Sequence, residues 1–274
     1  MTERFSVPIL PIGPHPGGAI VCTEPKPQVY VLTWTSPPDN RITPAFCKAL
    51  LAALDVLEFG GYAPGVVITT SGIAKFYSNG LDLEMAINTE GFWALFYSVW
   101  KRFLTFPMPT VALLNGHTYA GGLMLSMAHD YRLAPSPKGF ICLNEVLFGA
   151  PLKPAMAAIF RNKLPPSTCR ILALEGRRLT GADAVALGIA DETATSIDDA
   201  FAFIDKYQLL EKPKAGVYGV IKAELYNKLI KELDAAGLEA EEQRFADTQD
   251  KDHERKEFGR VWYEQWQKDN KAKL

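Results

Sequence analysis

The feature that most constrains the fold is a repeated order of strand, turn and helix in the first two thirds of the chain. Stretches rich in β-branched and aromatic residues at 28–34, 65–71 and 109–116 are typical of strands, and turn residues follow them. After the first of these, an amphipathic pattern over 43–59 begins with Thr-Pro, a common helix entry. Strands and helices that alternate in this way predict an α/β fold with parallel strand pairs.

The strand signals stop near residue 196, and this change divides the chain into three predicted parts. Residues 1–27 are rich in proline and are predicted to form an irregular N-terminal arm. Residues 28–195 are predicted to form the α/β core and to hold the functional site. Residues 196–274 are predicted to form a helical region that mediates oligomerisation.

The charged end of the chain carries three aromatic residues at helical spacing. Phe258, Trp262 and Trp266 recur at i, i+4 and i+8 within residues 239–274. This pattern predicts a helix with one apolar stripe. Two interpretations stay open at this point: the stripe packs onto the core of its own chain, or it contacts another subunit of an oligomer.

Charge and motif content narrow the possible functions. The 29 basic and 31 acidic residues leave a net charge of −2, and no block of like charge predicts binding to nucleic acid or to a membrane surface. No apolar run is long enough for a membrane span, and the N-terminus is a poor secretory signal. The histidines and cysteines show no metal-ligand spacing, and the common nucleotide-binding and serine-nucleophile motifs are absent. We expect a soluble intracellular protein without a metal site.

The last three residues are similar to a targeting signal. Ala272, Lys273 and Leu274 form a small–basic–Leu ending close to the S-K-L address that a peroxisomal import receptor reads. The ending predicts a location in the peroxisome matrix. The alternative is an ordinary chain end on a cytoplasmic protein.

Two short loops share one arrangement of small residues. "YSNGLD" (77–82) and "TYAGGL" (118–123) each follow a predicted strand and lead into a predicted helix. Glycine lets the backbone approach a ligand closely, and two convergent backbone N–H groups would form an oxyanion hole. The plainer interpretation is that Gly80 is a turn residue and that Asp82 caps the following helix.

A single acid stands out in "KGFICLNEVLFGAPL" (138–152). Glu145 has mostly apolar neighbours in this stretch, and an ionised carboxylate is costly to bury. Burial raises the pKa of a carboxyl group and makes it a better base than a solvated acid. Without further information, Glu145 is either a functional acid or base, or a partly exposed acid at the end of a strand.

The chain resembles the crotonase superfamily, which is the enoyl-CoA hydratase/isomerase family. The resemblance covers most of residues 28–195 and is carried by four segments: "GVVITTSGIAKFYSNGLDL" (65–83), "PMPTVALLNGHTYAGGLMLSMAHDYRLA" (107–134), "GFICLNEVLFG" (139–149) and "RRLTGADAVALGIADE" (177–192). It implies a spiral of ββα units with a C-terminal α-helical region that forms homotrimers or dimers of trimers. It also implies that a CoA thioester is bound with its oxygen held by two backbone N–H groups, at positions that match Leu81 and Gly121.

One departure from the family pattern indicates the reaction. Family hydratases carry a Glu three residues after the second oxyanion glycine, where this chain has Met124, and a second Glu at the position of Glu145. The dipeptide Asn144-Glu145, with "FYSNGLDL" and "SMAHDYRL", resembles the monofunctional peroxisomal 3-enoyl-CoA isomerases. This implies an isomerase that shifts the double bond of 3-enoyl-CoA to trans-2-enoyl-CoA, in the β-oxidation of unsaturated fatty acids.

The chemistry fits one carboxylate better than two. Hydration of a double bond requires one group to activate water and another to deliver a proton, whereas a 1,3-proton transfer can use one carboxylate for both steps. The resemblance therefore assigns the acid/base role to Glu145. Because the acyl group stays on CoA and no oxidation takes place, we expect no separate cofactor and no metal.

The remaining pocket residues are predicted less directly. Tyr77, Met124, Asn144 and His117 are candidates for the substrate pocket. His117 and Tyr119 either line this pocket or pack in a core loop, and Asn144 either hydrogen-bonds Glu145 or finishes a turn.

Two other classes of function remain as alternatives. The first is another crotonase activity, a hydratase or a thioesterase, in a biosynthetic pathway. The second is a homologue that binds acyl-CoA and has lost catalysis.

Overall fold

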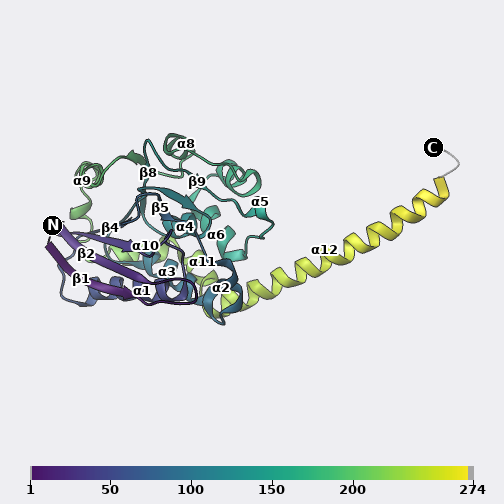
Figure 1. The fold of residues 1–274 in the computed structure, drawn as a ribbon, viewed down its shortest axis with the longest axis horizontal. Coiled ribbons are helices and arrows are strands. Elements are labelled where there is room, and N and C mark those ends of the chain that lie inside the picture. Colours follow the sequence, from purple (N-terminus) through teal and green to yellow (C-terminus); the bar gives the residue numbers. More distant parts are fainter. Residues whose placement is uncertain (1, 271–274) are drawn as a thin grey trace.

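A seven-stranded sheet forms the centre of the fold in this computed structural model, which describes residues 2–270 (Figure 1). Its strands, in spatial order, are β1 (Thr2–Ile9), β2 (Gly18–Lys26), β3 (Val29–Thr35), β4 (Val66–Ser71), β6 (Thr110–Leu113), β8 (Tyr131–Pro135) and β10 (Glu192–Ala194). The first three strands pair antiparallel, and the pairs from β3 to β10 are parallel. The predicted strands at 28–34, 65–71 and 109–116 are confirmed as β3, β4 and β6.

A second, smaller sheet completes a repeating unit. It consists of β5 (Phe76–Ser78), β7 (His117–Tyr119) and β9 (Ile141–Cys142), all parallel. Each strand follows one strand of the large sheet and precedes one of the short helices α2 (Leu83–Asn88), α4 (Gly121–Met127) and α5 (Glu145–Phe148). The chain thus winds through three successive ββα units, as the predicted α/β spiral requires.

The other helices cover the sheet and close the body. They are α1 (Pro44–Phe59), α3 (Phe92–Thr105), α6 (Pro154–Lys163), α7 (Pro166–Arg170), α8 (Gly181–Ala186), α9 (Ile197–Lys206), α10 (Tyr218–Leu225), α11 (Asn227–Glu232) and α12 (Ala235–Asn270), with a π-helical turn at Ile171–Glu175 and a 3₁₀ turn at Leu209–Glu211. Helix α1 begins after Thr43, whose side chain accepts a hydrogen bond from the N–H of Phe46, so the predicted helix entry is confirmed.

Both faces of the large sheet are buried, as is usual for parallel strands. The main hydrophobic core lies on the face covered by α1 and α3, which supply fully buried aromatic side chains such as Phe46, Phe96 and Trp100. On the other face, alternate residues of the strands pack against Phe203 and its neighbours on α9. The core therefore holds the strands rigidly at the ends where the short helices begin.

Residues 1–27 do not form the irregular arm that their proline content predicts, because β1 and β2 form an antiparallel hairpin within this segment. Strand β1 lies at the edge of the sheet, where the missing N–H of Pro8 removes no ladder hydrogen bond. Pro25 lies at an irregularity in the pairing of β2 with β3. Burial of alternate residues, Ile20 and Cys22 on β2, is the strand signal that the prolines obscure.

A buried ion pair connects the C-terminal helices to the core. Lys222 on α10 is 5% exposed and lies 2.9 Å from Asp130, whose carboxylate also accepts hydrogen bonds from the backbone N–H and the hydroxyl of Thr110. The partners of Asp130, Thr110 and Lys222, belong to β6 and α10. Asp130 therefore has a structural role.

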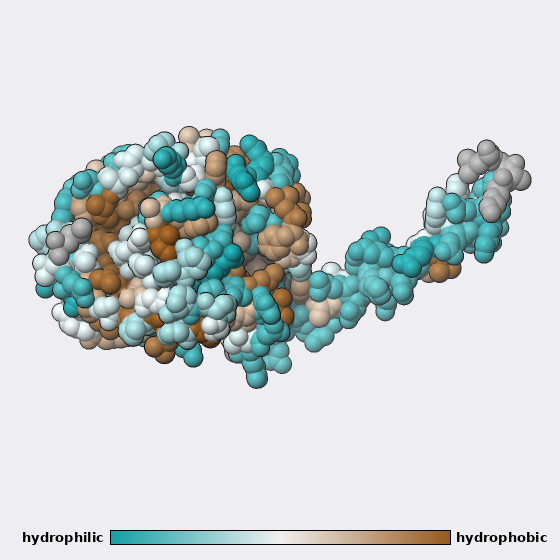
Figure 2. Space-filling view, in the orientation of Figure 1, coloured by the Kyte–Doolittle hydropathy of each residue, from teal (hydrophilic) through white to brown (hydrophobic). Residues whose placement is uncertain are grey.

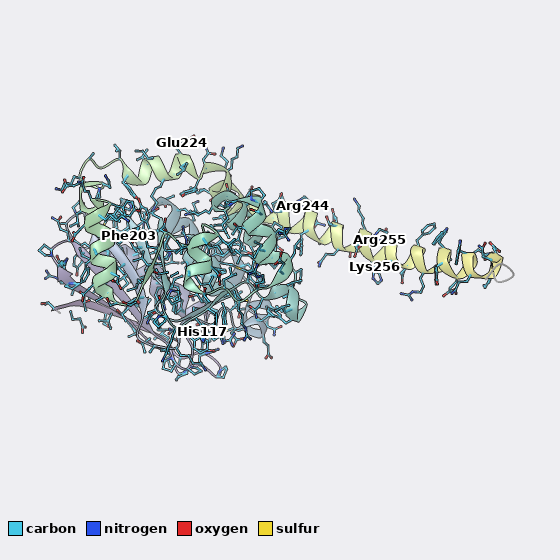
Figure 3. All side chains as sticks on the ribbon, turned by 90° about the horizontal axis from the view of Figure 1, so that it is seen from above. His117, Phe203, Glu224, Arg244, Arg255 and Lys256 are labelled. Atoms are coloured by element: carbon cyan, nitrogen blue, oxygen red, sulfur yellow. The ribbon has the colours of Figure 1, made fainter. Side chains whose placement is uncertain are left out.

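Helix α12 packs against α6 and α11 at its start and then leads away from the body (Figures 1 and 3). Most of its surface is hydrophilic (Figure 2). The predicted apolar stripe lies on the projecting part, where Phe258, Trp262 and Trp266 are 74%, 58% and 40% exposed. The interpretation that this stripe packs onto the core of its own chain is therefore wrong.

Within residues 2–270, no helix combines the length and the apolar character that a membrane span requires. The predicted targeting tripeptide, Ala272-Lys273-Leu274, lies outside the described residues.

Candidate active site

The two glycine-containing loops lie side by side because the strands that precede them, β5 and β7, are parallel neighbours. Gly80 has a φ of +84°, a backbone conformation that favours glycine. A Cβ atom at this residue would lie 3.0 Å from the carbonyl oxygen of Tyr119 and 3.2 Å from the backbone nitrogen of Gly121. The conformation and the close approach together explain why glycine is required here.

The backbone nitrogens of Leu81 and Gly121 belong to these adjacent loops. A Cβ atom at Gly121 would lie 3.3 Å from the nitrogen of Leu81 and 2.9 Å from its Cγ. Gly121 is the first residue of α4, where helix geometry leaves the N–H without an intrahelical acceptor. Within residues 2–270, neither N–H finds a backbone acceptor in a turn, loop or cap. Two such N–H groups on touching loops can serve an oxyanion.

Hydrogen bonds from the loop before α1 hold the first of these loops in place. The guanidinium of Arg41 donates to the carbonyl oxygens of Asn79, at 3.1 Å, and Leu81, at 3.0 Å. The N–H of Ile42 donates to the carbonyl oxygen of Gly80 at 2.9 Å. The N–H groups of Asn79 and Gly80 are bonded as well, to the carbonyl oxygen of Asp39 at 3.0 Å and to Oγ of Ser78 at 3.2 Å, so the loop is fixed on both sides of Leu81. Arg41 was not identified from the sequence, because the loop that it holds lies about forty residues away and is bound through backbone atoms.

The second loop contains backbone strain. Ala120 has a φ of 49° and a ψ of −121°, which is rare for a residue with a side chain. Its N–H donates to the carbonyl oxygen of Cys142 on β9 at 2.9 Å. This bond fixes the turn that precedes Gly121. Asp82 caps α2 by accepting a hydrogen bond from the N–H of Met85, as the plainer interpretation of that residue predicts.

Glu145 follows β9 and begins the short helix α5. It is buried, with 7% of its surface exposed. Desolvation by burial raises its pKa to about 7, partly offset by a hydrogen bond from its own backbone N–H. Its Oε2 atom and the Oδ1 atom of Asn144 are buried and have no partner among the described residues. Glu145 is therefore a carboxyl group with a pKa near neutrality and with an oxygen available to a bound molecule.

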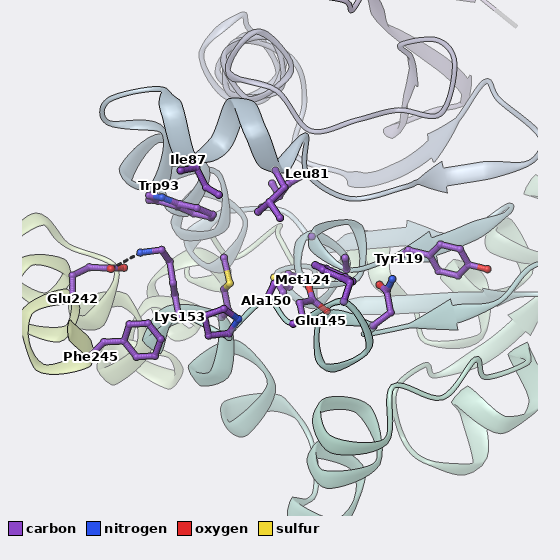
Figure 4. A pocket seen from close by; sticks show the side chains of 18 of the residues that line it. Leu81, Ile87, Trp93, Tyr119, Met124, Glu145, Ala150, Lys153, Glu242 and Phe245 are labelled. Atoms are coloured by element: carbon purple, nitrogen blue, oxygen red, sulfur yellow. Dashed lines mark hydrogen bonds and ion pairs between the residues drawn. The ribbon is translucent and has the colours of Figure 1, made fainter. Parts of the chain in front are cut away.

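Glu145, Leu81 and Gly121 line one cavity of about 780 Å³ (Figure 4). Met124, which is 1% exposed, and Asn144 also contribute to its wall. Most other parts of the wall are apolar residues of α2, α3, α5, α6 and the loop between the last two: Leu83, Ile87, Trp93, Phe148, Ala150, Pro151 and Met156. The charged Lys153, just before α6, also lines the cavity. The cavity has the size of a typical site for a small molecule.

Two of the residues predicted for the pocket lie outside this lining. Tyr77 is fully buried in the core, where its hydroxyl group lies 3.0 Å from Oγ1 of Thr69. His117 is not part of the lining, and its Nδ1 accepts a hydrogen bond from the N–H of Phe140 at 3.1 Å. His117 and Tyr119 are two residues apart on β7 and so share one face of the strand, with their ring centroids 5.1 Å apart. Tyr119 lines the cavity, and its hydroxyl group lies 3.1 Å from Nδ1 of His117.

Sequence reasoning missed one whole side of the cavity. Four residues of α12 contribute to the lining: Glu242, Phe245, Ala246 and Gln249. They follow i, i+3, i+4 and i+7 spacing and so share one helix face. Because most of them are small or polar, the spacing of apolar residues could not indicate this face.

Comparison with known proteins agrees with this geometry. Residues 24–270 match the family model described as enoyl-CoA hydratase/isomerase. Enoyl-CoA delta isomerase 3 of Arabidopsis thaliana is 32% identical over 229 residues, which cover 78% of this chain and 95% of that protein. The peroxisomal enoyl-CoA delta isomerase 2 of the same plant is 32% identical over 227 residues, which cover 76% and 93%. Human mitochondrial delta3-delta2-enoyl-CoA isomerase has the same fold, with a TM-score of 0.72 at 23% identity over 91% of this chain and 98% of that one.

Proposed function

Because this chain belongs to the enoyl-CoA hydratase/isomerase family, we propose that it moves the double bond of a 3-enoyl-CoA ester to the trans-2 position. Both Arabidopsis relatives are enoyl-CoA delta isomerases, and more than nine tenths of each is covered by the match. The chain is an isomerase with the crotonase fold. Beyond this activity, we propose the substrate, the mechanism and the residues that carry out the reaction.

The observation that carries the proposal is a single buried carboxylate in the cavity next to an oxyanion site. Glu145 and Met124 both line the wall, and Met124 occupies the position at which a hydratase of this family would supply its second carboxylate. A methionine side chain neither titrates nor orients water strongly. The arrangement therefore favours proton transfer by one group over the addition of water.

The proposed reaction is an internal proton transfer. The carboxylate of Glu145 takes a proton from C2, and the electron pair of that C–H bond spreads into a dienolate whose charge rests mainly on the thioester oxygen. The N–H groups of Leu81 and Gly121 donate hydrogen bonds to this oxygen. The protonated Glu145 then returns the proton to C4, which leaves the double bond between C2 and C3. No oxidant, reductant or water is consumed, so the route requires no redox cofactor.

The oxyanion donors and the general base Glu145 lower the activation barrier in different ways. Removing one oxyanion donor typically costs roughly 2.7–4 kcal/mol in other enzymes. A positioned general acid or base typically contributes about 10²- to 10⁴-fold in rate, and it works best when its pKa lies near the working pH. The pKa of Glu145, raised to about 7 by burial, meets this condition.

Positive charges near one end of the cavity indicate where the CoA part of the ester would bind. Tyr119, at one end of the lining, lies close enough to Arg178 for this cation to lower its pKa, although burial raises it more. The neighbouring His117 has its pKa lowered by burial and by Lys75 and Arg178. Positive charge near Tyr119 suits the phosphates of CoA. The acyl chain would then extend towards the opposite end, which is lined by Ile87 and Trp93.

We also propose that the enzyme works in the peroxisome, in the β-oxidation of unsaturated fatty acids. One Arabidopsis relative is named as peroxisomal, whereas the human structural relative is mitochondrial. The Ala272-Lys273-Leu274 ending supports the peroxisome through an import receptor. A fluorescent fusion that lacks these three residues should stay in the cytosol. A punctate pattern that persists without them would contradict this part of the proposal.

Assembly into homotrimers or dimers of trimers belongs to the same proposal. The exposed Trp262 and Trp266 on α12 support it, because two large aromatic side chains on a charged helix are usually covered by a partner. Light scattering should give a mass that is a multiple of three chains. A monomer at micromolar concentration would contradict it.

The product formed from a 3-enoyl-CoA by the wild type and by Glu145→Gln tests the central proposal. We expect the wild type to form trans-2-enoyl-CoA and the variant to be slower by about two to four orders of magnitude, because glutamine cannot carry the proton. Binding of the ester should survive, since the side chain keeps its shape. Glu90→Gln, an exposed acid between α2 and α3, is the matched control and should leave the rate unchanged.

Three results would contradict the proposal in different ways. Unchanged turnover in Glu145→Gln would remove this residue from the mechanism. Hydration of trans-2-enoyl-CoA faster than any 3-enoyl turnover would favour a hydratase. Tight binding of the ester without any turnover by the wild type would indicate a homologue that binds acyl-CoA and does not act on it.

A further inference from the structure

The start of α12 forms the end wall of the cavity that lies farthest from Tyr119 (Figure 4). The four lining residues between Glu242 and Gln249 share one helix face, as described above. Beyond them the helix leaves the body, so this short stretch is the part of α12 that meets the cavity. Whatever holds the stretch in place also determines how far the cavity extends.

One lysine connects three helices at this end. Lys153 precedes the first residue of α6, and its ammonium group forms an ion pair with Glu242 of α12. The same ammonium group lies 5.1 Å from the ring centroid of Trp93 on α3, within the range of a cation–π contact. The Lys153 side chain is 23% exposed and that of Glu242 is 35% exposed, so the pair is partly withdrawn from water.

The wall between Glu145 and this ion pair is apolar. Ile87, Met156 and Phe245 line it together with the ring of Trp93. An alkyl chain that grows along this wall gains affinity with each buried methylene, by about fourfold for each one. At the ion pair this gain must stop, because a further methylene would displace a charged pair and leave its members without partners.

We propose that the ion pair of Lys153 and Glu242 closes the acyl end of the cavity and sets the longest acyl chain that the enzyme binds well. This inference rests on the proposed function, since it takes the bound molecule to be an acyl-CoA. The two residues are specificity-determining and take no part in proton transfer. Chains that stop short of the pair bind along the apolar wall, and longer chains gain no further affinity.

The test measures the affinity of the full-length protein for saturated hexanoyl-, decanoyl- and palmitoyl-CoA by calorimetry. For the wild type, the affinity should rise along the series and then level off before palmitoyl-CoA. In Lys153→Met the side chain keeps its length and loses its charge, so the affinity should continue to rise, and palmitoyl-CoA should bind about tenfold more tightly than it binds the wild type. Glu242→Gln should shift the series in the same direction. Because glutamine is nearly isosteric with glutamate, this second variant still tests the proposal if Lys153→Met fails to fold.

The matched control breaks an ion pair of the same type elsewhere. Lys206 on α9 lies 2.6 Å from Glu192 on β10, far from the cavity lining, so Lys206→Met should leave the series as in the wild type. A wild-type affinity that rises without a plateau up to palmitoyl-CoA would overturn the inference, as would folded Lys153→Met and Glu242→Gln variants with the wild-type series. If the proposed function were wrong, no 3-enoyl-CoA would be isomerised. That result comes from the activity assay and is independent of the binding series.

Discussion

The two ends of the cavity are built from different parts of the chain. At the end that holds Glu145, the groups proposed to act on the substrate are two backbone N–H groups and one carboxyl, all just after strands of the small sheet. At the opposite end, the wall consists of side chains from three helices that an ion pair connects. The first arrangement depends on the path of the main chain and tolerates little change. The second can be altered by single substitutions without moving the sheet.

This difference predicts two classes of variant. Changes near Glu145 should lower turnover and leave the choice of acyl chain unaltered. Changes near Lys153 should alter which acyl chain binds and leave turnover of a well-bound substrate nearly unaltered. A variant that affects both properties equally would show that the two ends are not independent.

After Glu145→Gln, the largest effect is expected from Gly121→Ala. The added Cβ would lie 2.9 Å from Cγ of Leu81, so this side chain and its loop must move. Because both proposed oxyanion N–H groups belong to these two loops, we expect kcat to fall by about 10²- to 10³-fold, the loss typical of one missing donor. Stopped-flow absorbance with a 3-enoyl-CoA measures it.

Gly259→Ala provides the matched control for that variant. Gly259 lies within α12, and a Cβ there would have no neighbour within 4 Å. Turnover should stay at the wild-type value, because alanine is a better helix former than glycine and touches nothing. If Gly121→Ala retained the wild-type kcat, the backbone N–H of Gly121 would have no part in stabilising the dienolate.

Strand and helix signals predicted most of the elements that hold the reactive end. The predicted helix at 43–59 and strand at 65–71 coincide with α1 (Pro44–Phe59) and β4 (Val66–Ser71) to within one residue. These segments have strong periodicity and clear ends, so local sequence was sufficient. The N-terminal hairpin was missed because prolines on an edge strand and at an irregularity resemble a loop in the sequence.

The far end of the cavity could not be predicted in the same way. Lys153 and Glu242 are 89 residues apart in the chain, and both are residue types that usually lie in water. No local pattern brings such a pair together. The loops of Gly80 and Gly121, in contrast, share a local pattern of small residues between a strand and a helix, which the sequence shows directly, and the pairing of β5 with β7 brings them together.

An effect of intermediate size is expected from pH. Burial raises the pKa of Glu145 to about 7, and the proposed base is its ionised form. As the pH falls below this value the carboxylate is protonated, so kcat/KM should decrease about tenfold per unit and should be level about one unit above it. The residual rate of Glu145→Gln should show no such fall, since glutamine does not titrate. A midpoint near the ordinary value of 4.5 would show that Glu145 is solvated in the free enzyme.

The smallest effect should follow from Phe245→Ala, at the end of the cavity away from Glu145. Phe245 contributes its ring to the apolar wall, and its loss removes contact area from a long acyl chain while the backbone of β5, β7 and β9 stays in place. We expect KM for a long-chain 3-enoyl-CoA to rise by about tenfold, in line with an aromatic contact of about 1–2 kcal/mol, and kcat to change by less than about twofold. Phe59→Ala, at an exposed residue that ends α1 and lies outside the cavity lining, is the matched control and should leave both constants unchanged. A fall in kcat of Phe245→Ala as large as that of Gly121→Ala would mean that the wall at α12 also positions the thioester, and the division between a reactive end and a selective end would have to be abandoned.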